Sequence, residues 1–106
     1  MAAPYNPPVK GENFVFRIAL ADLATPGSFK VPPTIAAADF NVWTDTTDKG
    51  ALDTEPTIDP AGSMWVLITL SADEMNGDVI SFRAIDQTNP KEWADYACCI
   101  PTVAAS

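Results

Sequence analysis

Apolar and polar residues alternate along several short stretches of this chain, a two-residue period typical of β-strands with one buried face. The alternation is clearest in Phe14–Leu20, Phe40–Asp45 and Met64–Leu70. Val79–Ile85 follows the same rule, with its polar side chains on the outward positions. The pattern predicts a core made of Phe14, Phe16, Ile18, Leu20, Phe40, Val42, Val66, Ile68, Leu70, Ile80 and Phe82.

Turn-forming residues separate these stretches at short intervals. Thr25–Gly27 and Asp48–Gly50 are turn signals, and short strands are expected after them at Ser28–Val31 and Ala51–Asp53. A last strand is expected within Glu92–Ile100. The number and spacing of these segments predict an all-β fold, an immunoglobulin-like antiparallel β-sandwich of about seven short strands.

The remaining segments define the domain organisation. Thr34–Asp39 is the one helical candidate, a single turn long, and Pro56 and Pro60 bracket a loop or edge segment. With 106 residues, the chain is expected to form one domain. We expect a proline-rich N-terminal arm over residues 1–12, the sandwich over 13–101 and a C-terminal tail over 102–106.

The acidic segment between two strong strands, Leu70–Asp78, has the residues of a capped turn. Ser71 stands three positions before Glu74, the spacing of a capping box. Met75 is placed to fill the end of the core, and Asn76–Gly77 is expected to supply a turn with positive φ. These structural roles account for every residue of the corner, so we favour them over a catalytic use of Asp73 or Glu74.

Composition narrows the function further. The net charge is −8, with only six basic residues, so the surface repels phosphate backbones and anionic lipids. Neither nucleic acid nor a membrane is therefore expected as a partner. The chain has no histidine and five glycines, so no serine–histidine nucleophile or glycine-rich phosphate loop is expected. We predict a non-enzymatic protein without a cofactor.

The two cysteines are adjacent, Cys98 and Cys99, and neighbouring strand residues point to opposite faces. They are not expected to bond to each other, which fits synthesis in a reducing cytosol. A metal site built on them lacks the histidine that would complete it, so none is expected. The first residues lack the basic and apolar regions of a signal peptide.

The acidic loop from Asp45 to Glu55 raises the question of calcium binding. An EF-hand beginning at Asp45 would place Lys49 and Pro56 at ligand positions, so that match fails. An irregular site from Asp45, Asp48 and Asp53 remains an alternative, but solvated turn residues explain the loop better.

Several aromatic side chains are predicted to lie on the surface. The strand phase turns Trp43, Trp65 and Leu67 outward. The phase of the last strand is ambiguous: an outward Asp95 would place Tyr96, Cys98 and Ile100 inside and Trp93 outside. Exposed apolar groups usually mark a partner surface, and the proline-rich arm offers a further anchor. The predicted interface residues are Tyr5, Pro7, Pro8, Trp43, Trp65 and Leu67. A carbohydrate-binding surface that stacks on the tryptophans is the alternative.

Three motifs carry a family resemblance. They are "PPTIAAADFNVWTD" (residues 32–45), the turn Pro60–Ser63 and "LITLSADEMNGDVISFRAID" (residues 67–86). With the later Glu92–Trp93 pair, they resemble a group of small structural proteins of tailed bacteriophages over roughly residues 14–100. The adjacent cysteines and the long arm depart from that pattern.

The resemblance implies a β-sandwich that is a component of the virion and has no catalytic residues. The expected partners are other virion proteins and copies of this chain. The expected location is the virion, after synthesis in the host cytoplasm. The tail or a tail fibre is the preferred position, and capsid decoration is an alternative. A carbohydrate-binding module for host attachment, with a host-surface glycan as its ligand, is the alternative of another class.

Overall fold

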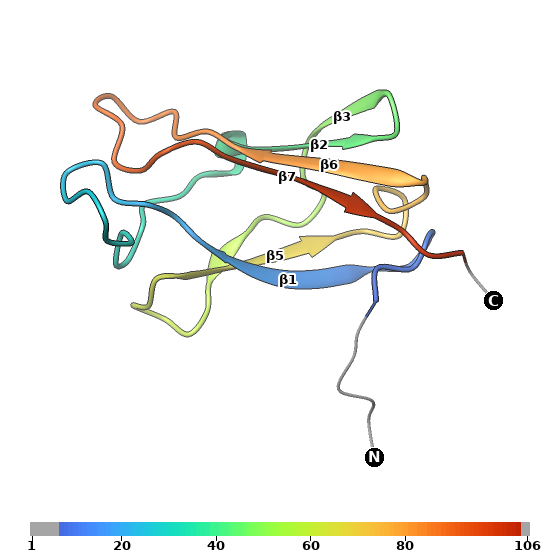
Figure 1. Cartoon of the computed structure of the whole chain (residues 1–106), viewed down its shortest axis with the longest axis horizontal. Coiled ribbons are helices and arrows are strands. Elements are labelled where there is room, and N and C mark those ends of the chain that lie inside the picture. Colours follow the sequence, from blue (N-terminus) through green and yellow to red (C-terminus); the bar gives the residue numbers. More distant parts are fainter. Residues whose placement is uncertain (1–6, 105–106) are drawn as a thin grey trace, which may run out of the picture.

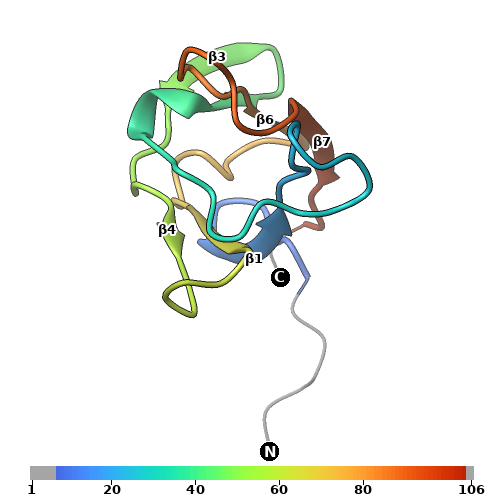
Figure 2. The same cartoon turned by 90° about the vertical axis from the view of Figure 1, so that its left-hand side faces the viewer.

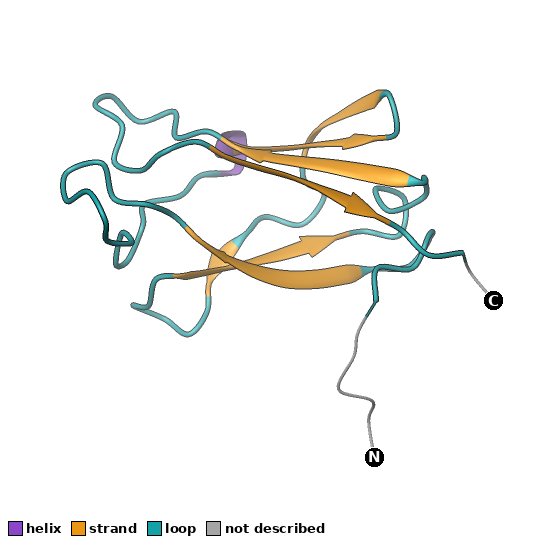
Figure 3. Ribbon diagram, in the orientation of Figure 1, coloured by secondary structure: helices purple, strands orange, loops and turns teal. Residues whose placement is uncertain are grey.

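The computed structural model describes residues 7–104 of the chain, which form two antiparallel β-sheets packed face to face (Figure 1). The prediction of an all-β sandwich is confirmed: seven strands and one short 3-10 turn make up the described chain (Figure 3). An immunoglobulin-like topology stays a prediction. The elements are β1 (Phe14–Ala19), η1 (Ala37–Asp39), β2 (Phe40–Thr44), β3 (Thr47–Ala51), β4 (Thr57–Ile58), β5 (Trp65–Leu70), β6 (Val79–Ala84) and β7 (Tyr96–Pro101).

The strands form a three-stranded sheet, β1-β5-β4, and a four-stranded sheet, β3-β2-β6-β7. Strands β7 and β1 are the edges on one side of the sandwich, and β3 and β4 are the edges on the other (Figure 2). Backbone pairs tie the flanks of β1 to those of β7, namely Val9 with Val103 and Asp22 with Trp93. The sandwich is thus joined at both ends of its β1–β7 side.

The core lies between the sheets, and most of its predicted members are buried there. Nine of the eleven are in the buried core, and the other two, Phe14 and Phe16, are partly buried and pack against it. Both phenylalanines belong to β1, an edge strand that has a neighbour on one side only. Phe16 still packs edge-on against Phe82, with ring centroids 5.6 Å apart.

Two expectations about local structure were wrong. Asp48–Gly50 is not a turn: it lies inside β3, and the β2–β3 hairpin reverses at Asp45 and Thr46. Gly50, with φ of 73°, sits beside a register shift in that hairpin, where a β-bulge needs a left-handed residue. Ser28–Val31 forms no strand either, since only Phe29 makes an isolated bridge.

The acidic corner after β5 is a capping box, as predicted. Glu74 Oε1 accepts the Ser71 N–H at 2.8 Å, and Ser71 Oγ accepts the Glu74 N–H at 3.2 Å. Met75 is fully buried at the end of the core. The role given to Gly77 was wrong, because its φ is not positive. It is needed for space, since a Cβ there would lie 2.7 Å from the Thr44 methyl carbon.

The last strand follows its predicted phase, but Trp93, which lies three residues before the strand, does not. Tyr96 and Cys98 face the core and are half-buried, and Ile100 is buried. Trp93, predicted to lie outside, is completely buried and stacks on Phe40. It precedes β7, so the alternation of that strand does not extend to it.

Candidate functional site

The predicted interface residues lie on opposite faces of the sandwich. Trp65 and Leu67 project from β5, where alternate residues are buried in the core. Trp43 projects from β2, on the outer face of the other sheet. The structure therefore brings Trp65 and Leu67 together and separates them from Trp43.

The outer face of β1 and β5 carries exposed apolar side chains. Trp65 is 39% exposed and Val15 is 44% exposed, while Leu67 is half-buried between them. Across β5, Arg17 of β1 reaches Asp59, just beyond β4, at 3.3 Å. This ion pair spans β5 at the position of Leu67, since Arg17 lies directly opposite Leu67 in the register. We call this surface the β1–β5 face; it carries exposed apolar side chains and one ion pair.

Sequence reasoning missed a second group of exposed apolar residues. Leu23, Phe29 and Val31 lie in the long loop after β1, and each is about half exposed. The loop starts at the end of the sandwich where Trp65 begins β5, because Ala19 pairs with Trp65. Pro32 and Pro33 were visible in the sequence as a break in structure. The exposure of Phe29 and Val31 was not predicted, because Ser28–Val31 was expected to form a strand.

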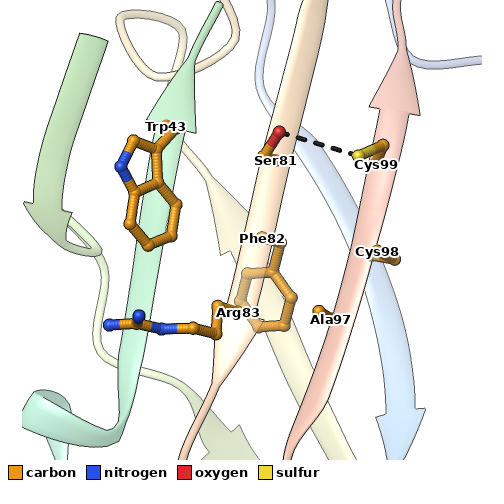
Figure 4. A pocket seen from close by; sticks show the side chains of 7 residues that line it. All are labelled: Trp43, Ser81, Phe82, Arg83, Ala97, Cys98 and Cys99. Carbon is orange, nitrogen blue, oxygen red and sulfur yellow. Dashed lines mark hydrogen bonds between the residues drawn. The ribbon is translucent and has the colours of Figure 1, made fainter. Parts of the chain in front are cut away.

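Trp43 lines a shallow hollow of about 490 Å³ on the outer face of the four-stranded sheet (Figure 4). The guanidinium of Arg83 lies over the indole, with its carbon 5.0 Å from the ring centroid, and one of its nitrogens donates to Asn41 Oδ1 at 3.2 Å. The buried Nε of Arg83 has no hydrogen-bond acceptor among residues 7–104. The electron-rich face of Trp43 is therefore already occupied by a cation of the same chain.

The other side of this hollow is small and weakly polar. Ser81 and Cys99 face each other across β6 and β7, with Oγ and Sγ 3.7 Å apart (Figure 4). Ala97 completes this side. A thiol and a hydroxyl without a neighbouring base form no activated nucleophile.

The described end of the arm lies against the domain. Pro7 and Pro8 are half-buried, and the Pro8 carbonyl accepts the Val103 N–H at 2.8 Å. The Lys10 N–H donates to the carbonyl of Val103 at 2.9 Å. Tyr5, the predicted aromatic anchor, lies outside the described residues.

The acidic residues considered for calcium have structural partners. Asp45 Oδ1 accepts the N–H of Asp78 at 2.9 Å, Asp48 accepts that of Gly50, and Asp53 accepts the hydroxyl of Ser71 at 2.7 Å. Across residues 7–104, no three cysteine or carboxylate side chains gather where they could hold a metal ion. The same residues include no helix with the length and apolar character needed to cross a bilayer.

Three groups have perturbed pKa values. Burial raises the pKa of Tyr96, and the neighbouring Cys98 adds to this effect. Burial likewise raises the pKa of the Cys98 thiol. Burial opposes the ionisation of Asp86, yet N–H donors led by Glu92 and Thr88 hold its pKa below the usual value. Each shift arises from packing or from loop hydrogen bonds.

Comparisons with protein-family models, with curated proteins and with solved structures find no match to this chain. The resemblance to bacteriophage proteins therefore stays a prediction based on the sequence motifs.

Proposed function

We propose that this chain is a non-enzymatic structural protein of a tailed-bacteriophage virion, where it docks on other virion proteins. The tail or a tail fibre is the preferred position, and capsid decoration is the alternative. The proposal joins the motif resemblance to an antiparallel sandwich in which Glu74, Asp45 and Asp53 accept hydrogen bonds within turns and loops.

The observation that carries the docking role is the β1–β5 face. In a chain with a net charge of −8, a surface that exposes Trp65 and Val15 beside Leu67 is costly to leave in water. Tryptophan is enriched at the centre of protein interfaces because it buries a large area with few rotatable bonds. The exposed apolar side chains of the loop after β1, led by Phe29, lie at the end of the sandwich where Trp65 begins β5.

The carbohydrate-binding alternative is weaker at the position that would serve it best. A sugar stacks on an open aromatic ring, but Arg83 lies over Trp43 inside the hollow that this tryptophan lines. Trp65 is open, yet its neighbour along the outer face of β5 is aliphatic Leu67, and the nearby charged groups of Arg17 and Asp59 are paired with each other.

The proposal is tested by locating the protein. Mass spectrometry of purified phage particles should find this chain at a fixed ratio to a known virion protein, and the ratio should survive repeated density-gradient centrifugation. A chain that stays with the soluble host fraction would overturn the virion assignment. Specific retention on a glycan array by the wild-type chain, lost in Trp65→Ala, would favour the carbohydrate-binding alternative.

A further inference from the structure

Strand β7 has an open hydrogen-bonding edge in the described structure. It is the last strand of its sheet, paired only with β6. The Asp45 N–H donates to the Val79 carbonyl, so odd-numbered residues of β6 turn their backbone groups toward β2. Even-numbered residues of β6 face β7, as the bond from the Thr102 N–H to the Asp78 carbonyl confirms. It follows that Ala97 and Cys99 of β7 direct their N–H and C=O groups away from the sheet.

The other edge strands of the described chain have features that discourage pairing with another chain, namely short length, charged side chains or a bulge. Strand β4 has only two residues, and β3 carries Asp48 and Lys49 beside a bulge. Strand β1 carries Arg17. Strand β7, by contrast, reads Tyr-Ala-Cys-Cys-Ile-Pro and has no charged side chain along its six residues. It is an uncharged edge on a strongly acidic protein.

Two prolines interrupt the pairing of the described end of the arm with the segment after β7. The parallel pair Val9–Val103 places Val103 between the Pro8 carbonyl and the Lys10 N–H. At the next step of this ladder, toward the middle of β7, the hydrogen bonds would need backbone N–H groups at positions 101 and 8. Both positions are proline, which has no backbone N–H. Pro101 costs nothing within the sheet, because its missing donor faces outward. The rung next to Val9–Val103 therefore has no backbone donor, and β7 is paired only with β6 among residues 7–104.

A half-buried apolar seam lies beside the open edge. Phe14 and Phe16 of β1 and Tyr96 and Cys98 of β7 pack against the core from the β1–β7 side without being fully covered. Phe14 and Phe16 stack with ring centroids 5.5 Å apart. A strand added to β7 would place its inward side chains next to this seam, so backbone pairing and apolar burial favour the same surface.

We propose that the partner is β7 of a second copy of this chain, paired antiparallel about a two-fold axis to give one continuous eight-stranded sheet. Centring the axis on Cys98 sets Ala97 opposite Cys99 of the partner, and each of these residues exchanges two hydrogen bonds. Two copies of charge −8 repel each other, and the uncharged β7 edge lets their backbones meet without opposing like charges. This surface is separate from the β1–β5 face, so either proposal can fail alone.

The first test removes only the outward donor. Cys99→Pro deletes an N–H that faces away from β6, whereas the matched Cys99→Ser keeps that N–H and also lacks the thiol. Sedimentation velocity under reducing conditions should show a dimer for wild type and Cys99→Ser. The dissociation constant should rise at least about tenfold in Cys99→Pro, because symmetry removes two hydrogen bonds. A wild-type chain that stays monomeric at all soluble concentrations would overturn the proposal.

The second test does not depend on whether the proline variant folds. In the proposed register the two Cys98 Cα atoms face each other at about 4.5 Å, within the range of a disulfide, whereas the two Cys99 residues are diagonal neighbours. Added diamide accepts the two electrons and two protons that a thiol pair loses. Cys99→Ser, which keeps half-buried Cys98, should cross-link faster than Cys98→Ser, which keeps exposed Cys99. Chance collision favours the exposed thiol, so the reverse order would contradict the register.

Discussion

Glu74 offers the sharpest test of whether the acidic corner is structural. The residue is almost completely buried, and its two carboxylate oxygens accept the N–H groups of Ser71 at 2.8 Å and Asp53 at 2.9 Å. Its own carbonyl accepts the Thr44 hydroxyl at 2.6 Å. The side chain thus fastens the corner after β5 to the loop after β3, and the backbone fastens it to β2.

Replacing Glu74 with alanine leaves both N–H groups without their acceptors. Hydrogen bonds to a charged group contribute about 1.5–3 kcal/mol each, so the loss of two in Glu74→Ala should lower the free energy of unfolding by about 3–6 kcal/mol. That is a large fraction of the 5–15 kcal/mol typical of a domain. Glu74→Gln keeps one acceptor oxygen and should lose about 1–3 kcal/mol.

Urea denaturation followed by tryptophan fluorescence measures these losses. The matched control is Asp73→Ala on the same corner, whose side chain is 75% exposed in an ion pair with Lys49. It should cost no more than about 1 kcal/mol, because exposed ion pairs contribute little. A loss below about 1 kcal/mol in Glu74→Ala would refute the structural role and return this carboxylate to the list of catalytic candidates.

Three further predictions concern other parts of the fold. Trp93→Ala should cost about 3–5 kcal/mol in urea, whereas Trp93→Phe keeps most of the packing and loses only the 3.1 Å bond from Nε1 to the Thr34 carbonyl, about 1 kcal/mol. The lowered pKa of Asp86 adds stability above its unfolded pKa of about 3.9, and this stability is lost as the pH falls through its folded value. Asp86→Asn should therefore be less stable than wild type at pH 7 and should flatten the acid limb of a melting-temperature profile. At pH 8, Ellman's reagent should modify exposed Cys99 before Cys98, because burial shields the Cys98 thiol and raises its pKa; equal rates in Cys98→Ser and Cys99→Ser would contradict this.

The strand core could be predicted from the sequence because one physical signal dominates it. Val66, Ile68 and Leu70 occupy every second position of a strand buried on one side, and no turn residue interrupts them. The corner was predictable for a similar reason, since the spacing of Ser71 and Glu74 is a local property that tertiary contacts only reinforce.

The errors arose where tertiary geometry decides the outcome. Asp48–Gly50 has turn residues, but Gly50 supplies a bulge, and only the register with β2 distinguishes the two. Trp93 was placed by extending the phase of β7 past its first residue.

The grouping of the candidate interface residues could not be predicted for a related reason. Alternation tells which side chains of a strand point outward, but not which sheet the strand joins. Trp43 and Trp65 were both correctly turned outward, yet they lie on opposite faces. The exposed loop with Phe29 lacked any periodic signal.

The central claim, docking through the β1–β5 face, is tested most directly by incorporation into particles. Tagged wild type, the double variant Trp65→Ser with Leu67→Ser, and Val79→Ser would be produced in cells that assemble the phage, and their amounts in purified particles compared. Val79 is a matched control, since it is 41% exposed on the other sheet. We predict equal incorporation of wild type and Val79→Ser, and at least about a thirtyfold loss for the double variant, as expected when an interface anchor is removed. A double variant that folds and enters particles as well as wild type would contradict the account.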